Sequence, residues 1–270
     1  YFEAITKAIT TEDIVLDIGT GSGLLAMMAA KAGAKHVYAC EVIKPVADMA
    51  RQIVKENGFA DKITIFDKSS TVLEIGRDLP EPATFLVSEI LDIALLGEGV
   101  LPSLRHAENF LLTPNATVIP TSAKVWGQLV NCEYFKKMNT VENVHGFNLN
   151  AFNYFHHTSH GFDLEKDDHQ ALSEPFEVFA IDFKQLPDGP QTYTINIPIV
   201  SDGTAQAVVA WFDLNLFDGI EFSTRKGERH NHWRQIVYFL DKEIAVKESS
   251  VLTLSAGHTE KSLFFNVPKQ

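Results

Sequence analysis

The first 120 residues alternate short apolar runs with longer segments of helical periodicity, and this alternation constrains the fold more than any other feature of the sequence. The apolar runs predict buried strands, whereas the segments between them predict helices. We expect strands at 13–19, 36–42, 63–67, 83–89 and 116–120, and helices at 22–33, 45–58 and 103–112. Apolar strands that are separated by helices form a parallel sheet covered on both faces. Residues 1–120 are therefore predicted to form a Rossmann-like α/β domain.

The helical periodicity stops after Pro120, and strand-like runs separated by turn residues follow. These runs lie at 123–131, 176–183, 192–200, 205–216, 234–240, 250–257 and 262–267. Their short connections predict antiparallel pairing, so residues 121–270 are expected to form a mostly antiparallel β-barrel or sandwich. The exception is residues 133–172, which are aromatic-rich and irregular. An excursion of this length within a compact domain is usually functional or an interface.

A glycine-rich turn, VLDIGTGSG at residues 15–23, joins the first predicted strand to the first predicted helix. Gly19 and Gly21 allow a tight turn and a close backbone approach to a ligand, and the helix that follows offers free amide groups. A dinucleotide site would need a third glycine at position 24, where the chain has Leu24. The spacing instead fits S-adenosylmethionine, which has no pyrophosphate. The alternative is an ordinary turn between strand and helix.

Polar residues at the ends of the next two strands favour a bound nucleoside. Glu41 ends the second strand, where an acid can accept hydrogen bonds from both ribose hydroxyls. We expect Glu41 to contact the ribose alone, and the alternative is a solvated acid at a strand end. Lys68 and Ser69 follow the third strand, near the expected position of an adenine edge, and could equally be structural.

The run VSEILDIALLGEGVLPS at residues 87–103 is apolar, yet it contains three acids and no base. Burying a carboxylate is costly unless a cation meets it, so a cationic ligand is expected there. Glu89 follows the fourth strand at the ligand-binding edge of the sheet, and Glu98 comes nine positions later. Two carboxylates can hold one guanidinium, whose planar fork of donors matches carboxylate geometry. Asp92 is interpreted as a solvated or capping acid.

The charge balance fits a basic partner. The 270 residues have a formal net charge of −12, which argues against nucleic acid as a direct partner and would steer a cationic segment toward the chain. The two cysteines, Cys40 and Cys132, have neither zinc-site nor disulfide spacing, so a reducing compartment is expected. The sequence has no run that is long and apolar enough for a membrane span. We expect a cytoplasmic protein, with the nucleus as a second compartment, and no membrane partner.

Four segments together resemble the protein arginine methyltransferase family: VLDIGTGSGLLAMMAAKAG, YACEV, SEILDIALLGEG and NHWRQIVYFL. Their order and spacing match across nearly the whole chain, and LLGEGVLPS is most similar to the protein arginine methyltransferase 7 branch. The resemblance implies a Rossmann-like class I methyltransferase domain at 1–120, followed by a β-barrel substrate-binding domain at 121–270. It also implies S-adenosyl-L-methionine as cofactor, and a dimerisation arm at about 133–165 that makes a head-to-tail homodimer.

The resemblance also assigns roles to single residues. Glu89 and Glu98 match the family's paired glutamates, which bind the substrate arginine and are catalytic. His232 would be a further catalytic residue and Trp233 would close the arginine pocket from the barrel side; a purely structural histidine is the alternative. The expected cofactor-binding residues are Asp17, Gly19, Gly21, Glu41, Lys68 and Ser69. The histidine run at 156–160 lacks ligand geometry, so no metal site is predicted.

The expected reaction is methyl transfer from S-adenosylmethionine to arginine guanidinium nitrogens in basic protein segments. Gly99 and Val100 follow the second glutamate, which is the pattern of the monomethylating and symmetric branches, and monomethylation is favoured. The alternatives are a catalytically weak scaffold or dimerisation module with this fold, and a small-molecule methyltransferase. The resemblance places the helix that lids the cofactor before Tyr1, so weaker cofactor binding is expected of this chain.

Overall fold

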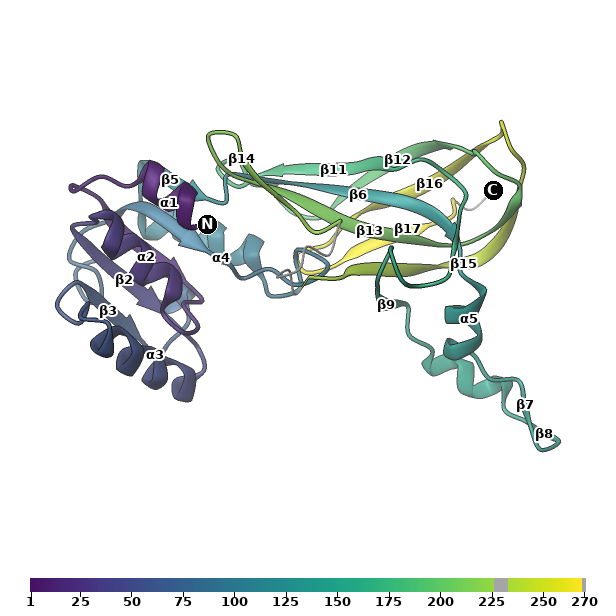
Figure 1. Ribbon diagram of the computed structural model, residues 1–270, viewed down its shortest axis with the longest axis horizontal. Helices are drawn as coiled ribbons and strands as arrows, with labels where there is room; N and C mark the ends of the chain where they lie inside the picture. Colours follow the sequence, from purple (N-terminus) through teal and green to yellow (C-terminus); the bar gives the residue numbers. More distant parts are fainter. Residues whose placement is uncertain (226–232, 269–270) are drawn as a thin grey trace.

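The computed structural model describes residues 1–225 and 233–268, and the side chains of residues 134–136 are outside this description. Its N-terminal part is a five-stranded parallel sheet in the order β3-β2-β1-β4-β5, with helices packed against it (Figure 1). The strands are β1 (Ile14–Ile18), β2 (His36–Cys40), β3 (Ile63–Phe66), β4 (Ala83–Ser88) and β5 (Leu112–Ile119). The helices are α1 (Phe2–Ala8), α2 (Leu24–Ala32), α3 (Lys44–Glu56), the short η1 (Ser70–Val72) and α4 (Val100–Phe110). The predicted parallel α/β domain is confirmed.

The strand order determines where a ligand can bind. The chain builds β1, β2 and β3 toward one edge, and then returns to the other side of β1 with β4 and β5. In open α/β sheets, ligands bind at the carboxyl ends of the strands, beside the point where the order reverses. The glycine turn, Glu41 and Glu89 follow β1, β2 and β4 respectively, so all three lie at this edge.

Helix α4 begins earlier than the sequence pattern predicts, at Val100 rather than at Ser103. Gly99 has a φ of 83°, in the left-handed region that glycine adopts without steric cost, and it turns the chain directly into the helix. Pro102 lies in the first turn of α4, where its missing amide hydrogen is not needed. As a result, α4 starts two residues after Glu98 and fixes the end of the loop that contains it.

Apart from a two-stranded hairpin described below, the described strands of the C-terminal part form two antiparallel sheets. The larger follows the path β10-β6-β13-β15-β9, with β11 paired to β6 and β14 paired to β13; the smaller is β12-β16-β17. The larger sheet comprises β6 (Ser122–Asn131), β9 (Ser159–Phe162), β10 (Gln170–Ala171), β11 (Phe176–Asp182), β13 (Gly203–Phe217), β14 (Ile220–Ser223) and β15 (Gln235–Val246). The smaller comprises β12 (Gln191–Pro198), β16 (Val251–His258) and β17 (Leu263–Asn266). Strand β13 is central, because it pairs with three others.

The predicted antiparallel β domain is confirmed, and both of its sheets contribute to one buried core. Phe179 of β11, Phe212 of β13, Leu254 of β16 and Phe265 of β17 all belong to this core. Pairing among the described strands leaves these two sheets separate and does not close one barrel. The change from parallel to antiparallel pairing falls between β5 and β6; the division of the chain into domains at residue 120 stays a prediction.

The segment 133–165 forms an arm that projects from the β domain (Figure 1). It contains α5 (Glu133–Asn139), the hairpin β7 (Asn143–Val144) and β8 (Phe147–Asn148), and η2 (Asn150–Phe155) before β9. The expectation of an irregular segment is therefore wrong in part. Side-chain hydrogen bonds hold this segment in place of apolar packing. The Asn153 side chain accepts a 2.8 Å hydrogen bond from the Val141 amide and donates a 2.9 Å hydrogen bond to the Val141 carbonyl oxygen. Strand β9 pairs with β15, so the end of the arm belongs to the sheet.

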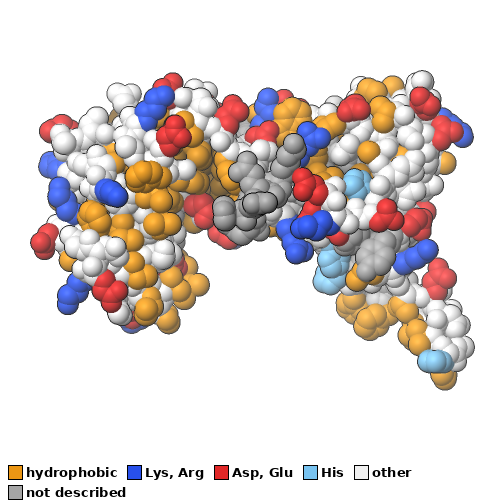
Figure 2. All heavy atoms as spheres, in the orientation of Figure 1, with side chains coloured by type: hydrophobic (Ala, Val, Ile, Leu, Met, Phe, Trp, Pro, Cys, Tyr) orange, Lys and Arg blue, Asp and Glu red, His pale blue; other side chains and the backbone are white. Residues whose placement is uncertain are grey.

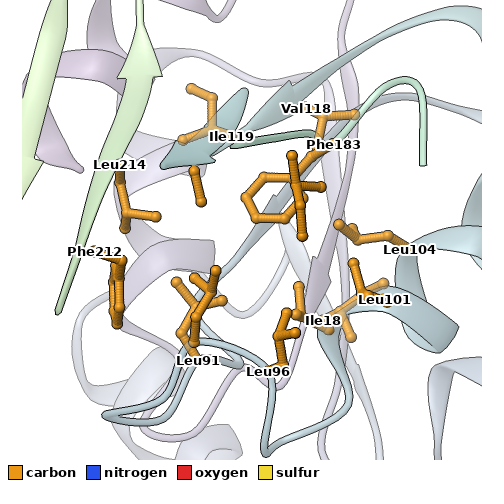
Figure 3. Close-up of a cluster of buried hydrophobic side chains, with 14 of the residues drawn as sticks. Ile18, Leu91, Leu96, Leu101, Leu104, Val118, Ile119, Phe183, Phe212 and Leu214 are labelled. Atoms are coloured by element: carbon orange, nitrogen blue, oxygen red, sulfur yellow. The ribbon is translucent and has the colours of Figure 1, made fainter. Parts of the chain in front are cut away.

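The two parts of the chain share a buried apolar core (Figure 3). Ile18 at the end of β1 faces Leu91 and Leu96, which come from residues 89–99, here called the glutamate loop. Phe212 and Leu214 of β13 cover the same cluster from the β domain. The glutamate loop is thus held between the parallel sheet and β13.

None of the described helices has the length and hydrophobicity needed to cross a bilayer.

Candidate active site

The glycine turn is in direct contact with the glutamate loop. Gly19 and Gly21 have φ angles of 74° and 54°, which glycine adopts readily. The Gly19 amide donates to the carbonyl oxygen of Cys40 at the end of β2, at 3.0 Å. A Cβ atom on Gly19 would lie 2.3 Å from Cγ2 of Ile90, so the close contact requires glycine at this position. The predicted cofactor turn and the predicted catalytic loop are therefore built against each other.

Asp17 is the buried acid of β1, directly before the glycine turn, and its side chain is 0% exposed. Its Oδ2 accepts a 2.5 Å hydrogen bond from the Thr20 hydroxyl, whereas its Oδ1 has no partner among the described residues. Burial raises the pKa of Asp17 to about 7, although the hydrogen bond from Thr20 acts in the opposite direction. A buried acceptor without a donor is costly, so this atom is suited to a ligand donor.

Glu41 lies at the end of β2 and holds the backbone of the site together. One of its carboxylate oxygens accepts a hydrogen bond from the Gly21 amide at 3.2 Å, and the other accepts from the Ile43 amide at 2.9 Å. The expectation that Glu41 contacts only a ribose is therefore wrong, because its carboxylate ties the glycine turn to the start of α3. Each oxygen retains a second lone pair, so ribose hydroxyls can still donate to Glu41.

Lys68 and Ser69, the predicted residues near the adenine edge, both have partners within the protein. The Lys68 ammonium pairs with Asp78 at 2.5 Å and lies 5.5 Å from the centre of the Phe66 ring. The Ser69 hydroxyl accepts a hydrogen bond from the Thr71 amide at 3.3 Å and caps η1. These contacts fit the structural alternative, and they leave the predicted adenine contact without direct support.

The apolar residues of the glutamate loop point into the protein. Leu91, Leu95 and Leu96 are buried, and Leu95 has a φ of 73°, which is unusual for a branched side chain. Such strain persists only where the surrounding structure holds it, and here the core shared with β13 does so. The loop is therefore apolar because it is packed on its inner side, while Glu98 on its outer side is exposed.

Asp92 is the capping acid that the sequence predicts. Its Oδ1 accepts hydrogen bonds from the amides of Ala94 and Gly97, at 3.1 and 2.9 Å. A Cβ atom on Gly97 would lie 2.1 Å from the Asp92 Oδ2 atom, so the cap requires glycine at position 97. Gly97 was not predicted as a site residue, although its place in the GEG motif beside Glu98 was the available signal. Asp92 and Gly97 together set the shape of the loop between the two glutamates.

The charge of Glu98 acts on Glu89. Burial and then the nearby Glu98 carboxylate together raise the pKa of Glu89 to about 7. The pKa of Glu98 is raised as well, by partial burial and then by the charges of Asp92 and Glu41. The structure thus brings the predicted pair of glutamates together, and both would be stabilised in the ionised form by an incoming cation.

Tyr1 is a site residue that the sequence analysis missed. Its hydroxyl donates a 3.0 Å hydrogen bond to the carbonyl oxygen of Ser88, at the end of β4. Burial raises the pKa of the Tyr1 phenol above its ordinary value, and so do the charges of Glu89 and Asp17. A single tyrosine ahead of a short amphipathic helix has no sequence pattern that marks it, which is why only the fold reveals this position.

The β domain contributes Trp233 to the same region. Its ring meets the ring of Phe212 edge-on, with the centroids 5.5 Å apart, and Phe212 belongs to the core under the glutamate loop. The predicted catalytic residue His232 lies outside the described residues. Within the described part of the chain, histidine, cysteine and acidic side chains form no group of three or more that could hold a metal ion.

Four carboxylates, those of Asp17, Glu41, Glu89 and Glu98, lie at the carboxyl edge of the parallel sheet and are here called the acidic edge. Glu41 raises the pKa values of both Asp17 and Glu98, and Glu98 raises that of Glu89, so the four carboxylates act on one another. Like charges held this close favour a cationic ligand, because it removes the mutual repulsion. The glycine turn beside them offers backbone amides and space for a nucleoside. The edge can therefore bind a nucleoside and a cation next to each other.

Two family profiles match the chain, one in each part. Residues 121–262 match the arginine methyltransferase oligomerization subdomain. Residues 2–98 match the ribosomal protein L11 methyltransferase family. A solved structure titled Trypanosoma brucei PRMT1 enzyme-prozyme heterotetrameric complex with AdoHcy is similar over 95% of this chain and 82% of its own, with a TM-score of 0.83 and 23% identity. At this identity the likeness shows the shared fold alone.

Curated relatives extend over the whole chain. The arginine N(omega)-methyltransferase of Streptomyces achromogenes subsp. streptozoticus is 37% identical over 96% of this chain and 72% of its own length. Protein arginine N-methyltransferase 7 of Xenopus laevis and of Oryza sativa subsp. indica are each 34% identical over at least 99% of this chain. The chain spans only 44% and 42% of the lengths of these two proteins. By these matches, the chain belongs to the arginine N-methyltransferase family.

Proposed function

We propose that this protein transfers methyl groups from S-adenosylmethionine to guanidinium nitrogens of arginine residues in basic protein segments. The observation that carries the proposal is the pair Glu89 and Glu98, whose pKa values are both raised at the carboxyl edge of the sheet. A half-buried carboxylate and an exposed one beside it are both stabilised by a cation, and the guanidinium of arginine stays ionised at every physiological pH. The net charge of −12 favours the approach of a basic segment.

The residues at the edge fit the proposed cofactor. The Asp17 Oδ1 atom is a buried acceptor without a donor among the described residues, and Gly19 and Gly21 leave room for close backbone approach. Glu41 lies where ribose hydroxyls would be expected, and it already orients the Gly21 amide. These residues would hold S-adenosylmethionine, which supplies a methyl group on a positively charged sulfur. Binding that cation is consistent with the acidity of the edge.

The two glutamates share one task in the proposed reaction, and Glu89 has a second task of its own. Together they hold the guanidinium and draw its positive charge toward the nitrogens that they bind, so that the remaining nitrogen becomes the better nucleophile. They also fix its direction, which is where much of the barrier reduction in a displacement arises. The nitrogen loses one proton when it gains the methyl group. Glu89, the more buried of the two carboxylates, is the group placed to receive that proton.

We further propose monomethylarginine as the main product, with symmetric dimethylarginine as the alternative. The support is the sequence Gly99–Val100 after the second glutamate, together with the two relatives named protein arginine N-methyltransferase 7. Of the two residues expected to narrow the pocket entrance, Ile90 packs against Gly19 and Trp233 packs against Phe212. The product assignment therefore rests on likeness and is tested directly by mass spectrometry.

The proposed partner for assembly is a second copy of the chain. The profile that matches residues 121–262 describes an oligomerization subdomain. Hydrophobic side chains gather on the arm and on the parallel-sheet domain (Figure 2). On the arm, Phe147, Phe152, Tyr154 and Phe155 are 68–86% exposed, and such density marks an interface. The parallel-sheet domain offers Leu24, Val42, Ile43 and Met49, which are also exposed.

We also propose a cytoplasmic location for the protein, with the nucleus as a second compartment.

The proposed activity is tested by tandem mass spectrometry of a glycine- and arginine-rich peptide after incubation with the protein and S-adenosylmethionine. We expect a mass increase of one methyl group on arginine, and no change in a matched peptide with lysine in place of arginine. Neutral losses at long incubation distinguish the dimethyl isomers, and abundant asymmetric dimethylarginine would refute the product assignment. A protein that binds the cofactor and methylates neither peptide would favour the scaffold alternative.

A further inference from the structure

A cavity of about 560 Å³ lies in the β domain, apart from the acidic edge. It is formed by neighbouring positions on three paired strands, since Trp126 of β6 is opposite Trp211 of β13, and Asp213 of β13 is opposite Ser223 of β14. The complete lining is Trp126, Pro175, Trp211, Asp213, Glu221, Phe222, Ser223 and Arg225. Two of the protein's three tryptophans therefore line one cavity.

The cavity and the candidate active site use opposite faces of β13. Phe212 and Leu214 point into the core that supports the glutamate loop (Figure 3). Because side chains alternate along a strand, Trp211 and Asp213 point to the other face, where they line the cavity. The ring of Phe212 also contacts Trp233. A bound chain at the cavity would thus lie near the active site without occupying it.

The lining is suited to a planar cation. The indole nitrogen of Trp126 donates a 2.7 Å hydrogen bond to the Asp213 Oδ2 atom, while the Asp213 Oδ1 atom is buried and has no partner among the described residues. Glu221 adds a second carboxylate. A guanidinium can stack on an indole face and donate to a carboxylate in its own plane at the same time. The unpaired Asp213 atom is the acceptor that such a ligand would need.

The protein's own Arg225 shows that the cavity accepts a guanidinium. Its central carbon lies 5.2 Å from the centre of the Trp211 ring. Within the described part of the chain, Arg225 forms no ion pair with Asp213 or Glu221, so it uses the aromatic face and leaves the carboxylates available. The Lys124 ammonium, 5.4 Å from the Trp126 ring, pairs with Glu177 at 3.1 Å. Arg225 is therefore the cation that an incoming guanidinium would replace.

We propose that this cavity binds a second arginine side chain of the substrate segment, stacked on Trp211 and held by Asp213 and Glu221. The proposal rests on the proposed function, because it assumes a substrate with several arginines. It assigns the cavity a role in recognition: one arginine enters the acidic edge while another anchors the segment on the far face of β13. Segments with two arginines are then bound more tightly than segments with one.

The direct test is a fluorescence titration of the full chain with N-acetyl-arginine methylamide. The Trp233→Phe background is used, so that the signal comes from Trp126 and Trp211. We expect saturable binding that is about fivefold to tenfold weaker in Glu221→Gln, which removes one carboxylate from the lining. The matched control is Glu108→Gln, an exposed acid on α4 with the same change of charge. Equal affinities in the two variants would overturn the proposal.

Arg225→Gln should change the affinity for the arginine probe in the opposite direction to Glu221→Gln. If Arg225 holds the place of a ligand, its removal should tighten binding of the arginine probe about threefold. Lys55→Gln, an exposed change on α3, controls for the loss of a positive charge. Weaker binding by Arg225→Gln would show that Arg225 builds the cavity and does not compete for it, which contradicts the proposal.

Kinetics with peptides separates this proposal from the proposed function. For the native sequence, we expect KM for a two-arginine peptide about fivefold lower than for a one-arginine peptide, with similar kcat. Glu221→Gln should remove this difference and leave kcat unchanged. If both peptides are methylated and the difference persists in Glu221→Gln, the cavity has no such role. If no peptide is methylated, the proposed function fails, while the fluorescence titration still decides whether the cavity binds arginine.

Discussion

At the scale of single residues, the candidate site is defined by carboxylates whose surroundings disfavour the ionised form. Glu89 and Asp17 both have pKa values raised to about 7, with burial as the main cause. An acid whose pKa is raised in the folded state loses stability as the pH increases from its ordinary pKa to the raised one. These two groups should therefore make the free protein less stable at neutral pH than at mildly acidic pH.

Glu89→Gln should separate stability from activity. The neutral amide needs no proton, so the variant escapes the loss of stability that Glu89 causes between about pH 4.5 and pH 7. We expect its thermal unfolding midpoint to exceed that of the parent at about pH 8, and this advantage to vanish near pH 4.5. Methyl transfer should be lost in the same variant. A pH-independent difference in unfolding midpoint between the two proteins would show that the Glu89 pKa is not raised.

Glu41→Ala tests the structural contacts of the predicted ribose acid. The change leaves the amides of Gly21 and Ile43 without acceptors, which should lower the free energy of unfolding by about 1–3 kcal/mol in the absence of cofactor. Urea unfolding measures this, with the exposed Glu12→Ala as the control. An unchanged stability would restore the initial expectation that Glu41 contacts only the ligand.

At the scale of elements, the glutamate loop depends on its cap. Gly97→Ala should displace the Asp92 carboxylate, lower stability by about 1–3 kcal/mol and slow methyl transfer more than tenfold, because the added Cβ would meet Asp92 Oδ2 at 2.1 Å. Gly161→Ala in β9 is the matched control, since its nearest atoms would be 4.0 Å away. Urea unfolding and a methylation assay measure the two effects.

A double variant checks the mechanism of that effect. In Asp92→Ala/Gly97→Ala the clashing carboxylate is gone, so the second substitution should cost less in stability than it does alone. Strict additivity of the two single changes would contradict the proposed cap.

The elements themselves show what a sequence can and cannot predict. The parallel strands were predicted because each is a short apolar run between helices, and β1 is buried along its whole length. The start of α4 was missed because Gly99 and Pro102 are ordinarily signs of a break, whereas here they lie in the entry to a helix. The regular parts of the arm were missed because asparagine hydrogen bonds, and not apolar periodicity, hold them.

The same limit applies to the site. Glu89 and the glycine turn could be predicted because they follow strands at one sheet edge, and Glu98 because it lies nine positions after Glu89 in an apolar run without a base. The backbone contacts of Glu41, the position of Tyr1 and the contact between Gly19 and Ile90 depend on packing between distant segments. No local pattern encodes such contacts, so they follow only from the fold.

At the scale of the whole molecule, the arm is expected to join two copies of the chain. Phe152→Ser with Phe155→Ser should lower the mass measured by light scattering from that of a dimer to that of a monomer, because both rings are exposed within one chain. Val251→Ser, an exposed change on β16, is the control and should leave the mass unchanged. A dimer that survives the double change, or a parent protein that is monomeric at high concentration, argues against the arm as the interface.

The central claim is that the paired glutamates at the sheet edge carry out methyl transfer to arginine. The most direct measurement is the rate of labelled methyl transfer to an arginine peptide under saturating S-adenosylmethionine, for the parent, Glu98→Gln and the control Glu108→Gln. We expect Glu98→Gln to be slower by about 10²–10³-fold, with its fold and its cofactor affinity preserved, since one charge of the guanidinium clamp is removed. Glu108→Gln should match the parent. A Glu98→Gln variant that methylates the peptide at nearly the parent rate would contradict the claim.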